Sequence, residues 1–350
     1  MYKYTHFIPQ NIAPKGSKQI GVYDSKGNKV CAIPLGRMTP PSGEPLYTFA
    51  LVSDPHIDAY EDNANSWKPR TKLDNALTYF EEMKCAFCVL CGDLTQTGFY
   101  RRTTESDEST TYYDEGQLKA YHDICKKHPN LPVYEIAGNH ETYFRIPLSN
   151  DITKWGEYTG KDVLHYAVEY QNDVFIFCGH PLSGTPMTDE AFTFLSDTLS
   201  VNRNKRCFVF VHPFWNDDSG DVNGLYANHS SGGGASLSLW SRGNELKNLL
   251  RQFPNAVLFH GHTHIKFEEQ AKDKSLNYTH KNGFHSVHIP SLGRPRDIID
   301  NALVYAPADS QGYLVDVYDD CIVLNGMDLI NNKPVPLGTL KIDTTGTITT

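Results

Sequence analysis

Several features are missing from this 350-residue sequence, and each absence excludes a class of protein. No stretch approaches the roughly 18 consecutive apolar residues that a membrane-spanning helix requires. The N-terminal residues MYKYTHFIPQNIAP contain no apolar core of the kind found in secretory signal peptides. Internal repeats and low-complexity tracts are also missing, so no repeat architecture is expected. We therefore expect a soluble, cytoplasmic protein that does not bind membranes.

Positive charge is scarce as well. The 32 Lys and Arg residues stand against 41 Asp and Glu residues, which gives a formal net charge of -9. A protein with this balance has no overall attraction for nucleic acid or acidic membranes. We expect neither as a partner.

Cysteines are few and give no sign of a disulfide framework. Cys85, Cys88 and Cys91 lie close together, but they fall in and beside the apolar run FCVLCG, which is typical of a buried strand. We interpret them as small core residues rather than as metal ligands. This use of cysteine fits a reducing compartment.

Strands and helices alternate along the first half of the chain. Apolar runs at LYTFALV, CAFCVLC and LPVYEIAG are separated by helical patterns at 66–84 and 117–127. This β-α-β-α-β order predicts an α/β fold. Further on, two antiparallel strands are expected around QND, followed by a helix over 189–199 with Thr188 as its N-cap.

The ends of the chain differ from its middle. Residues 1–45 contain two short β-like runs around SKGN, which predict a hairpin appendage followed by a Pro-rich linker. Residues 46–328 form the main domain, and residues 329–350 are expected to form a peripheral strand and tail. The appendage is expected to cover a sheet edge.

Polar clusters follow five of the predicted strands, each at the strand's C-terminal end. In an open α/β sheet, ligands bind in the crevice beyond these ends. Asp and His side chains suit divalent cations such as Mn, Fe and Zn. In Asp-Pro-His and His-Thr-His, residues two apart lie on the same side of an extended strand end. The clusters are Asp54 with His56, Asp93, Asn139 with His140, His212, and His262 with His264.

These five clusters, in this order, resemble the motifs of the calcineurin-like metallophosphoesterase superfamily. The corresponding segments are SDPHID, CGDLTQTG, AGNHE, VHPF and HGHTH, and the resemblance spans roughly residues 47–320. It implies a four-layer β-sandwich flanked by helices. It also implies two divalent metal ions (Mn, Fe or Zn). Asp54, His56 and His264 would hold one ion, Asn139, His212 and His262 the other, and Asp93 would bridge them.

The resemblance also implies a reaction. A hydroxide bridging the two metal ions attacks the phosphorus of a phosphate ester in line, and the cations neutralise the charge that builds on the phosphoryl oxygens. His140 would act with Asp93 in catalysis by aiding the leaving group, and Asn139 and His140 would also contact the substrate.

The residues around the motifs favour one branch of the superfamily. GDLTQTG lacks the Arg after Asp93 that is typical of protein Ser/Thr phosphatases, and Gln96 stands where purple acid phosphatases have a Tyr ligand. The segments look most like the bacterial cyclic-nucleotide and glycerophosphodiester phosphodiesterases, although that branch more often has Asp at the position of Glu141. A small phosphodiester is therefore the expected substrate. A phosphomonoesterase and a non-catalytic scaffold are the alternatives.

Two polar insertions, at 100–115 and 215–243, are expected to wall the pocket and set its specificity. His229, in the second insertion, is a candidate for substrate contact. Arg101, Arg102 and Arg294 could bind phosphate, but a solvent-exposed position is the default interpretation for each. His180, His285 and His288 fall in or beside apolar runs and are interpreted as packing residues. His260 alternates to the side opposite the predicted ligands and is not expected to be one.

Overall fold

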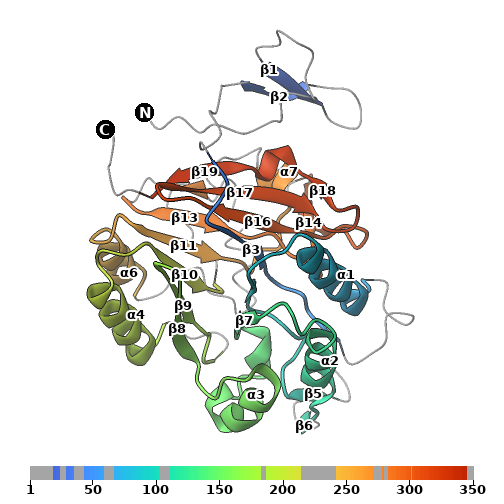
Figure 1. Ribbon diagram of the computed structural model, residues 1–350. Coiled ribbons are helices and arrows are strands. Elements are labelled where there is room, and N and C mark those ends of the chain that lie inside the picture. The colour runs from blue at the N-terminus through green and yellow to red at the C-terminus, as the bar shows by residue number, and fades with distance from the viewer. Residues whose placement is uncertain are drawn as a thin grey trace.

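Two β-sheets stacked face to face, with helices on both outer faces, make up the main domain (Figure 1). The structure is a computed structural model. It describes the backbone of two strands near the N-terminus and most of the chain from residue 43 onward. The ranges described are 19–23, 29–34, 43–58, 67–102, 111–182, 187–213, 242–270, 278–279, 283–300 and 302–344.

The first sheet has the strand order β18-β17-β16-β3-β4-β7, with β19 paired to β17. Its parallel part, β3-β4-β7, comes from the N-terminal half, and its antiparallel part comes from the end of the chain. The strands are β3 (Tyr47–Val52), β4 (Cys88–Cys91), β7 (Val133–Ile136), β16 (Gln311–Val317), β17 (Cys321–Asp328), β18 (Lys333–Pro334) and β19 (Leu340–Asp343).

The second sheet has the strand order β12-β13-β11-β10-β9-β8. Strands β9, β10, β11 and β13 run parallel, and the edge strands β8 and β12 are antiparallel to their neighbours. The strands are β8 (His165–Tyr170), β9 (Asp173–Cys178), β10 (Cys207–Val211), β11 (Ala256–His260), β12 (Tyr278–Thr279) and β13 (His285–His288).

Strict alternation along the strands builds the layers. In β10, Phe208 and Phe210 point into the space between the sheets, whereas Val209 points to the outer face. The inward side chains stack across strands, with ring centroids 4.6 Å apart for Phe175 and Phe208 and 5.2 Å apart for Phe210 and Phe259. Both faces of these strands are buried, which explains why their sequences are continuously apolar.

Among the described residues, three helices cover the outer face of the first sheet and two cover that of the second (Figure 1). The fold is therefore α-β-β-α. On the first sheet these are α1 (Pro69–Glu82), α2 (Gly116–Cys125) and α3 (Ile152–Thr159), and on the second they are α4 (Asp189–Val201) and α6 (Gly243–Leu250). The short elements are α7 (Phe267–Gln270), η2 (His140–Thr142), η3 (Leu148–Asp151) and η4 (Pro336–Gly338).

Local sequence signals account for the helix boundaries. The Thr188 hydroxyl accepts a hydrogen bond from the backbone N–H of Ala191 at 3.2 Å, so the predicted N-cap of α4 is confirmed. Helix α1 starts at Pro69 rather than at residue 66, because proline suits the first turn of a helix. None of the helices in the described part of the chain is long and apolar enough to cross a membrane.

In the described part of the chain, three two-stranded pairs lie outside the two sheets. Strands β1 (Gln19–Tyr23) and β2 (Lys29–Pro34) pair antiparallel, as the hairpin signal near the N-terminus predicts. The pair β5 (Tyr100–Arg102) and β6 (Thr111–Tyr113) gives the 100–115 insertion an antiparallel base that the sequence did not indicate. The pair β14 (Arg296–Ile299) and β15 (Ala302–Tyr305) was also not predicted.

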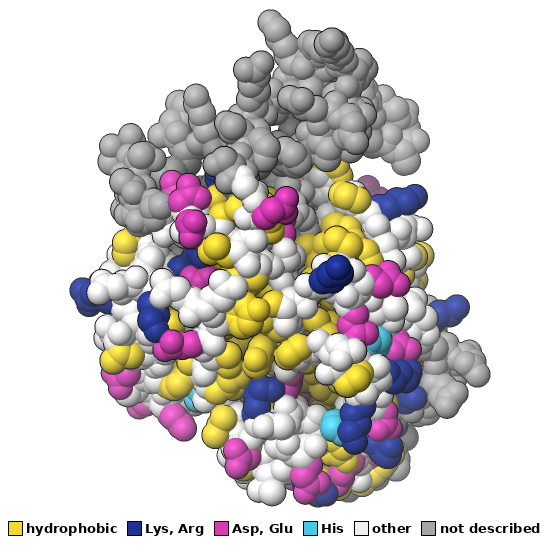
Figure 2. Space-filling view, in the orientation of Figure 1, with side chains coloured by type: hydrophobic (Ala, Val, Ile, Leu, Met, Phe, Trp, Pro, Cys, Tyr) yellow, Lys and Arg dark blue, Asp and Glu magenta, His cyan; other side chains and the backbone are white. Residues whose placement is uncertain are grey.

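The surface carries both acidic and basic side chains. Figure 2 shows acidic and basic side chains scattered over one face of the molecule, with hydrophobic side chains gathered near its middle.

All seven cysteines with described side chains are free, and Cys85, Cys88 and Cys91 are buried, as predicted.

Candidate metal centre

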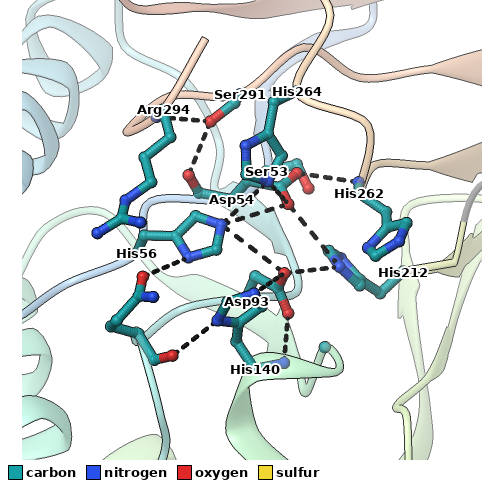
Figure 3. Close-up of polar contacts among 12 residues, drawn as sticks. Ser53, Asp54, His56, Asp93, His140, His212, His262, His264, Ser291 and Arg294 are labelled. Carbon is teal, nitrogen blue, oxygen red and sulfur yellow. Dashed lines mark hydrogen bonds and ion pairs between the residues drawn. The ribbon is translucent and has the colours of Figure 1, made fainter. Parts of the chain in front are cut away.

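Five parallel strands end at the same edge of the sandwich and deliver their polar residues there (Figure 3). Three of them, β3, β4 and β7, belong to the first sheet, and β10 and β11 belong to the second. The site therefore lies where the two sheets meet at the carboxyl ends of their strands, the usual place for ligands in α/β folds.

Backbone hydrogen bonds tie the strand ends to one another. The N–H groups of Asp54 and His56 donate to the carbonyls of Gly92 and Asp93, at 3.1 and 3.0 Å. Within the second sheet, the N–H of Gly261 donates to the carbonyl of His212 at 3.1 Å. The side chains of the site thus project from loops that brace each other.

Five site residues adopt the left-handed backbone conformation that is unusual for residues other than glycine. Such residues are typical of sites where the surrounding structure enforces a functional geometry. Their φ angles are 54° for Asp54, 53° for His56, 51° for Asp93, 75° for His262 and 66° for His264.

The first cluster comprises Asp54, His56, Asp93 and His264, all buried. The Nε2 atoms of His56 and His264 are 3.0 Å apart, and His264 Nε2 is 3.0 Å from Asp54 Oδ1. His56 Nε2 lies 3.8 Å from Asp54 Oδ1 and 3.7 Å from Asp93 Oδ2. The four side chains therefore converge on one point.

The second cluster comprises Asp93, His212 and His262, also buried. His212 Nε2 lies 3.1 Å from Asp93 Oδ2. The other ring nitrogen, Nδ1, donates a hydrogen bond to the Cys91 carbonyl at 2.8 Å, which orients the ring and leaves Nε2 as a ligand atom. Asp93 belongs to both clusters. Asn139 is nearly buried between Gly138 and His140, both of which approach Asp93.

The donor atoms of the site suit cations. Asp54 Oδ1, Asp93 Oδ2, Asn139 Oδ1 and His212 Nε2 are buried and make no hydrogen bond of good geometry with the described residues, although His212 and His264 lie within ion-pair distance of the carboxylates. A buried polar atom without a partner is costly, and several converging acceptors repel each other. Positive charge placed between them removes both penalties, so the residues present fit a pair of metal ions.

The pKa shifts of the site residues also indicate that the site attracts positive charge. Burial is the largest effect on His212 and lowers its pKa, but Asp93 and Asp54 outweigh it and raise the pKa to about 10. Burial likewise raises the pKa of Asp93, yet His212 and His140 hold that pKa well below its usual value. The two carboxylates attract a positive charge, and without metal a proton on His212 supplies it.

His140 sits at the edge of the site rather than inside it. Its backbone N–H donates to Asp93 Oδ1 at 2.8 Å, and its Nδ1 donates to the Gln96 carbonyl at 2.7 Å. Nε2 faces Asp93 Oδ2 at 3.9 Å, and the side chain is 18% exposed, whereas the His56 side chain is 1% exposed. The ring is therefore held in place and accessible.

Glu141 has a role that the motif letters did not reveal. Its carboxylate accepts hydrogen bonds from the N–H and hydroxyl of Thr95, at 2.8 and 2.9 Å, and from the N–H of Gly138 at 2.7 Å. It thereby joins the loop after Asp93 to the loop before Asn139. Burial, with a smaller effect from Asp93, raises the pKa of Glu141 to about 7.

Two of the remaining histidines support the loop of His262 and His264. His288 lies 2.7 Å from the hydroxyl of Thr263, which stands between these two residues, and His260 bonds Ser286 at 3.1 Å. His180 is buried, and burial together with the charge of His212 lowers its pKa to about 4, against a smaller opposite effect of Asp93. His229 and residues 214–241 of the second insertion lie outside the described residues.

The layered fold and the pair of Asp/His clusters define the class: an α/β protein with a candidate dinuclear metal centre at its strand ends. Residues 47–266 match the family model described as calcineurin-like phosphoesterase. The match covers more than half of the chain, and the chain belongs to this family. Membership places it among the phosphoester hydrolases. A comparison with curated proteins found no match.

Solved structures of low sequence identity share the fold. A dimetal phosphatase from Danio rerio is 13% identical, with a TM-score of 0.56, and the match covers 86% of this chain and 100% of that one. A purple acid phosphatase from yellow lupin is 13% identical, with a TM-score of 0.53 and coverage of 87% and 55%. GAP50, described as the anchor in the inner membrane complex of Plasmodium, is 15% identical, with a TM-score of 0.53 and coverage of 85% and 88%.

Proposed function

We propose that the chain is a dinuclear metal-dependent phosphodiesterase acting on a small phosphorylated molecule. The observation that carries the proposal is the convergence of buried acceptor atoms without hydrogen-bond partners from both sheets. Asp54, His56 and His264 would hold one cation, Asn139, His212 and His262 the second, and Asp93 both. Nitrogen and oxygen ligands together admit Mn, Fe or Zn.

When bound, two divalent cations polarise phosphoryl oxygens and make a water molecule acidic enough to react near neutral pH. The chain's own residues fix the geometry. Asp54 and Asp93 have their second oxygens bound by the N–H groups of His262 and His140, at 3.1 and 2.8 Å, so one oxygen of each carboxylate stays directed at the site. This preorganisation means that little rearrangement accompanies the reaction.

His140 is the group best placed to contact the reacting phosphate ester. Its Nδ1–H is committed to the Gln96 carbonyl, so Nε2 is the atom that faces the substrate. In the protonated form, Nε2 can donate a proton to the leaving oxygen. In either form, the side chain can contact the phosphoryl group. Gln96 also lies 3.1 Å from His56 Nδ1, so one loop orients both rings.

The preference for a diester is supported by the residues after Asp93. Thr95 is bound to Glu141, and the Gln96 side chain to His56, so this loop offers no arginine to the second charge of a monoester. A phosphomonoesterase is the alternative. A scaffold of the same fold is the second alternative. The presence of all seven proposed ligands, brought to one edge, favours the enzyme.

Steady-state hydrolysis of bis-p-nitrophenyl phosphate and p-nitrophenyl phosphate, each in Mn²⁺, tests the proposal. Faster cleavage of the diester, abolished by Asp93→Ala, is the expected result. Faster cleavage of the monoester would replace the diester assignment by the alternative. If neither ester is cleaved, the number of bound metal ions decides: a metal-free protein would overturn the enzymatic assignment.

A small phosphorylated molecule as substrate, rather than nucleic acid, is part of the proposal and follows from the net charge of -9. The cytoplasmic location also stays a prediction. The substrate class can be checked with single- and double-stranded DNA and RNA as substrates in Mn²⁺. Cleavage of these at rates similar to those for small diesters would contradict it.

A further inference from the structure

The position of Arg294 differs from the solvent-exposed one that the sequence favoured. Instead of extending into solvent, its side chain is half-buried, with the guanidinium carbon 5.7 Å from the centre of the Trp67 ring. Its Nε is buried and has no hydrogen-bond partner among the described residues.

The backbone before Arg294 is bound to the loop that carries Asp54 and His56. The Leu292 and Gly293 N–H groups donate to the carbonyls of Ser53 and Asp54, at 2.8 and 3.1 Å. The Ser291 hydroxyl donates to the Asp54 carbonyl at 2.9 Å and accepts from the Arg294 N–H at 2.8 Å. These bonds fix the start of the arginine side chain relative to the metal centre.

Gly293 makes this contact feasible. A Cβ at this position would lie 2.0 Å from the Pro55 carbonyl oxygen, so only glycine allows the two segments to lie this close. Lys72, from α1, donates to the Gly293 carbonyl at 2.9 Å and braces the same segment from the other side. Arg294 is therefore held on a rigid support rather than on a free loop.

The position of the guanidinium group relative to the site is visible in Figure 3. Arg294 lies on the His56 side of the site, away from His212 and His262. Its guanidinium group thus lies beside the first cluster rather than among the ligand atoms. An anion bound there would belong to a part of the substrate next to the phosphate that is cleaved.

The surroundings of Arg294 are rich in positive charge. Lys72 Nζ lies 5.8 Å from the centre of the Trp67 ring, and Arg296 lies over the Tyr305 ring at 4.3 Å. Tyr305, which also hydrogen-bonds the Arg294 side chain, and the Asp58 carboxylate both favour the charged form of Arg294. Asp58 also faces Arg101 at 3.7 Å. Burial lowers the pKa of Arg294, which an incoming anion would offset, although arginine stays charged throughout.

We propose that Arg294, held against Trp67, binds a second anionic group of the substrate, beyond the phosphate that the metal centre cleaves. The substrate class is then a phosphate ester with an additional phosphate or carboxylate on the same small molecule, such as a nucleoside bisphosphate derivative. This inference rests on the proposed function. A charge-assisted arginine contact changes affinity by about tenfold or more.

Two synthetic diesters test it: the 5′-p-nitrophenyl esters of thymidine 5′-monophosphate and of thymidine 3′,5′-bisphosphate. They share the cleaved group and the nucleoside and differ only in the 3′-phosphate. With Mn²⁺, we expect kcat/KM to be at least about tenfold higher for the second ester. Arg294→Met should abolish this preference while leaving the first ester's kcat/KM within about threefold.

Arg203→Met is the matched control, since Arg203 also lies over an aromatic ring, that of Phe253 at 5.3 Å, but on the second sheet's outer side. It should keep the preference. Equal kcat/KM for the two esters in the wild type, or a preference that survives Arg294→Met, would overturn the subsite.

A binding measurement that needs no turnover separates failure of the Arg294 subsite from failure of the proposed enzymatic function. Titration calorimetry compares thymidine 3′,5′-bisphosphate with thymidine 5′-monophosphate on the Mn²⁺-loaded protein. Tighter binding of the bisphosphate that is lost in Arg294→Met supports the subsite even if neither ester is cleaved. Equal binding of the two nucleotides by the wild type would refute it independently of catalysis.

Discussion

At the scale of single residues, exposure separates His140 from the histidines of the two clusters. His56, His212, His262 and His264 are buried with their nitrogens directed at one another or at carboxylates, whereas His140 stands at the rim with its ring oriented by a carbonyl. A buried histidine among carboxylates suits a metal ligand. An accessible and oriented one suits contact with substrate.

His140→Ala should therefore lower kcat without removing metal. Loss of a positioned acid or charge-stabilising group costs about 10²–10⁴-fold in rate. The backbone N–H of His140 still bonds Asp93 in the variant, so the bridging carboxylate keeps its orientation. Steady-state kinetics together with metal analysis check the outcome. Metal loss equal to the activity loss would show that His140 is a ligand instead.

The sequence predicted the residues that the structure brings together at the strand ends, but not the contacts that support them. Asp54, Asp93 and His264 could be found because each follows an apolar run with a motif of few letters. In the sequence, Glu141 stood out only as a departure from the Asp that is more common at this position of the motif. Its hydrogen bonds to Thr95 and Gly138 depend on how two loops meet. Such contacts join residues that are far apart in the chain, and no local pattern encodes them.

At the scale of strands and helices, the turns that end the strands decide whether the ligands meet. Gly92, directly after β4, has φ of +87°, and a Cβ there would lie 2.4 Å from His212 Nδ1. The ring of a proposed ligand from the other sheet thus occupies the space beside this glycine. The tight turn and the close approach both depend on the missing side chain.

Gly92→Ala should displace His212 and weaken metal binding, with a loss of kcat/KM of at least about tenfold. Gly160→Ala is a matched control, because Gly160 has φ of +76° but nothing within 4 Å of its Cβ position. Both variants lose about 1 kcal/mol of stability from the left-handed backbone. Metal affinity measured by competition with a chelator should fall in the first alone. A similar fall in both would remove the steric explanation.

Elements with strong local signals were predictable, and those with weak signals were not. Strands buried on both faces appear as apolar runs, and α4 has both a cap and a hydrophobic face. Helix α3 was missed because its sequence ITKWGEYT contains a glycine and buries only Trp155. Strand β15 was missed because it is mostly exposed, so no alternation marks it.

At the scale of the whole molecule, a buried ionic network joins the two sheets at β3 and β9. Tyr47 of β3 donates to Asp173 of β9 at 2.5 Å, and Arg206 binds both Asp173 oxygens, at 3.0 and 2.7 Å. Arg206 also donates to the Tyr318 carbonyl at 2.7 Å, which adds the end of β16. These contacts lie where β3 and β9 begin, far along the strands from the ligands.

Asp173→Ala should lower the free energy of unfolding by about 3 kcal/mol, because it leaves the Arg206 charge buried without its partner. Metal content should stay unchanged. Glu169→Ala is the control, since Glu169 pairs with Lys205 at the surface, where such a pair contributes under about 1 kcal/mol. Denaturant unfolding measures both. Equal losses of unfolding free energy in the two variants would mean that the buried ion pair contributes no more stability than the exposed one.

Glu135 makes global stability depend on pH. Burial, partly offset by Lys161 at 3.0 Å, raises its pKa from about 4.5 to about 7. A carboxyl with a raised pKa in the folded state binds protons more tightly when folded. Its contribution is therefore present below pH 4.5 and is lost as the pH rises toward 7.

The free energy of unfolding of the wild type should thus fall relative to that of Glu135→Gln by roughly 3 kcal/mol between pH 4.5 and 7. Denaturant unfolding of metal-free protein at several pH values gives the comparison. A constant difference between the two proteins across this range would show that Glu135 is ionised at all of them.

The left-handed backbone of five site residues has a cost for the stability of the whole molecule. Each such residue costs about 1 kcal/mol relative to glycine, so the five together forgo about 5 kcal/mol, comparable to the entire net stability of many domains. Glycine at these positions would relieve that cost but would remove the Asp and His side chains that converge at the strand ends. The edge that gathers these side chains is therefore also the part of the fold where backbone strain is concentrated.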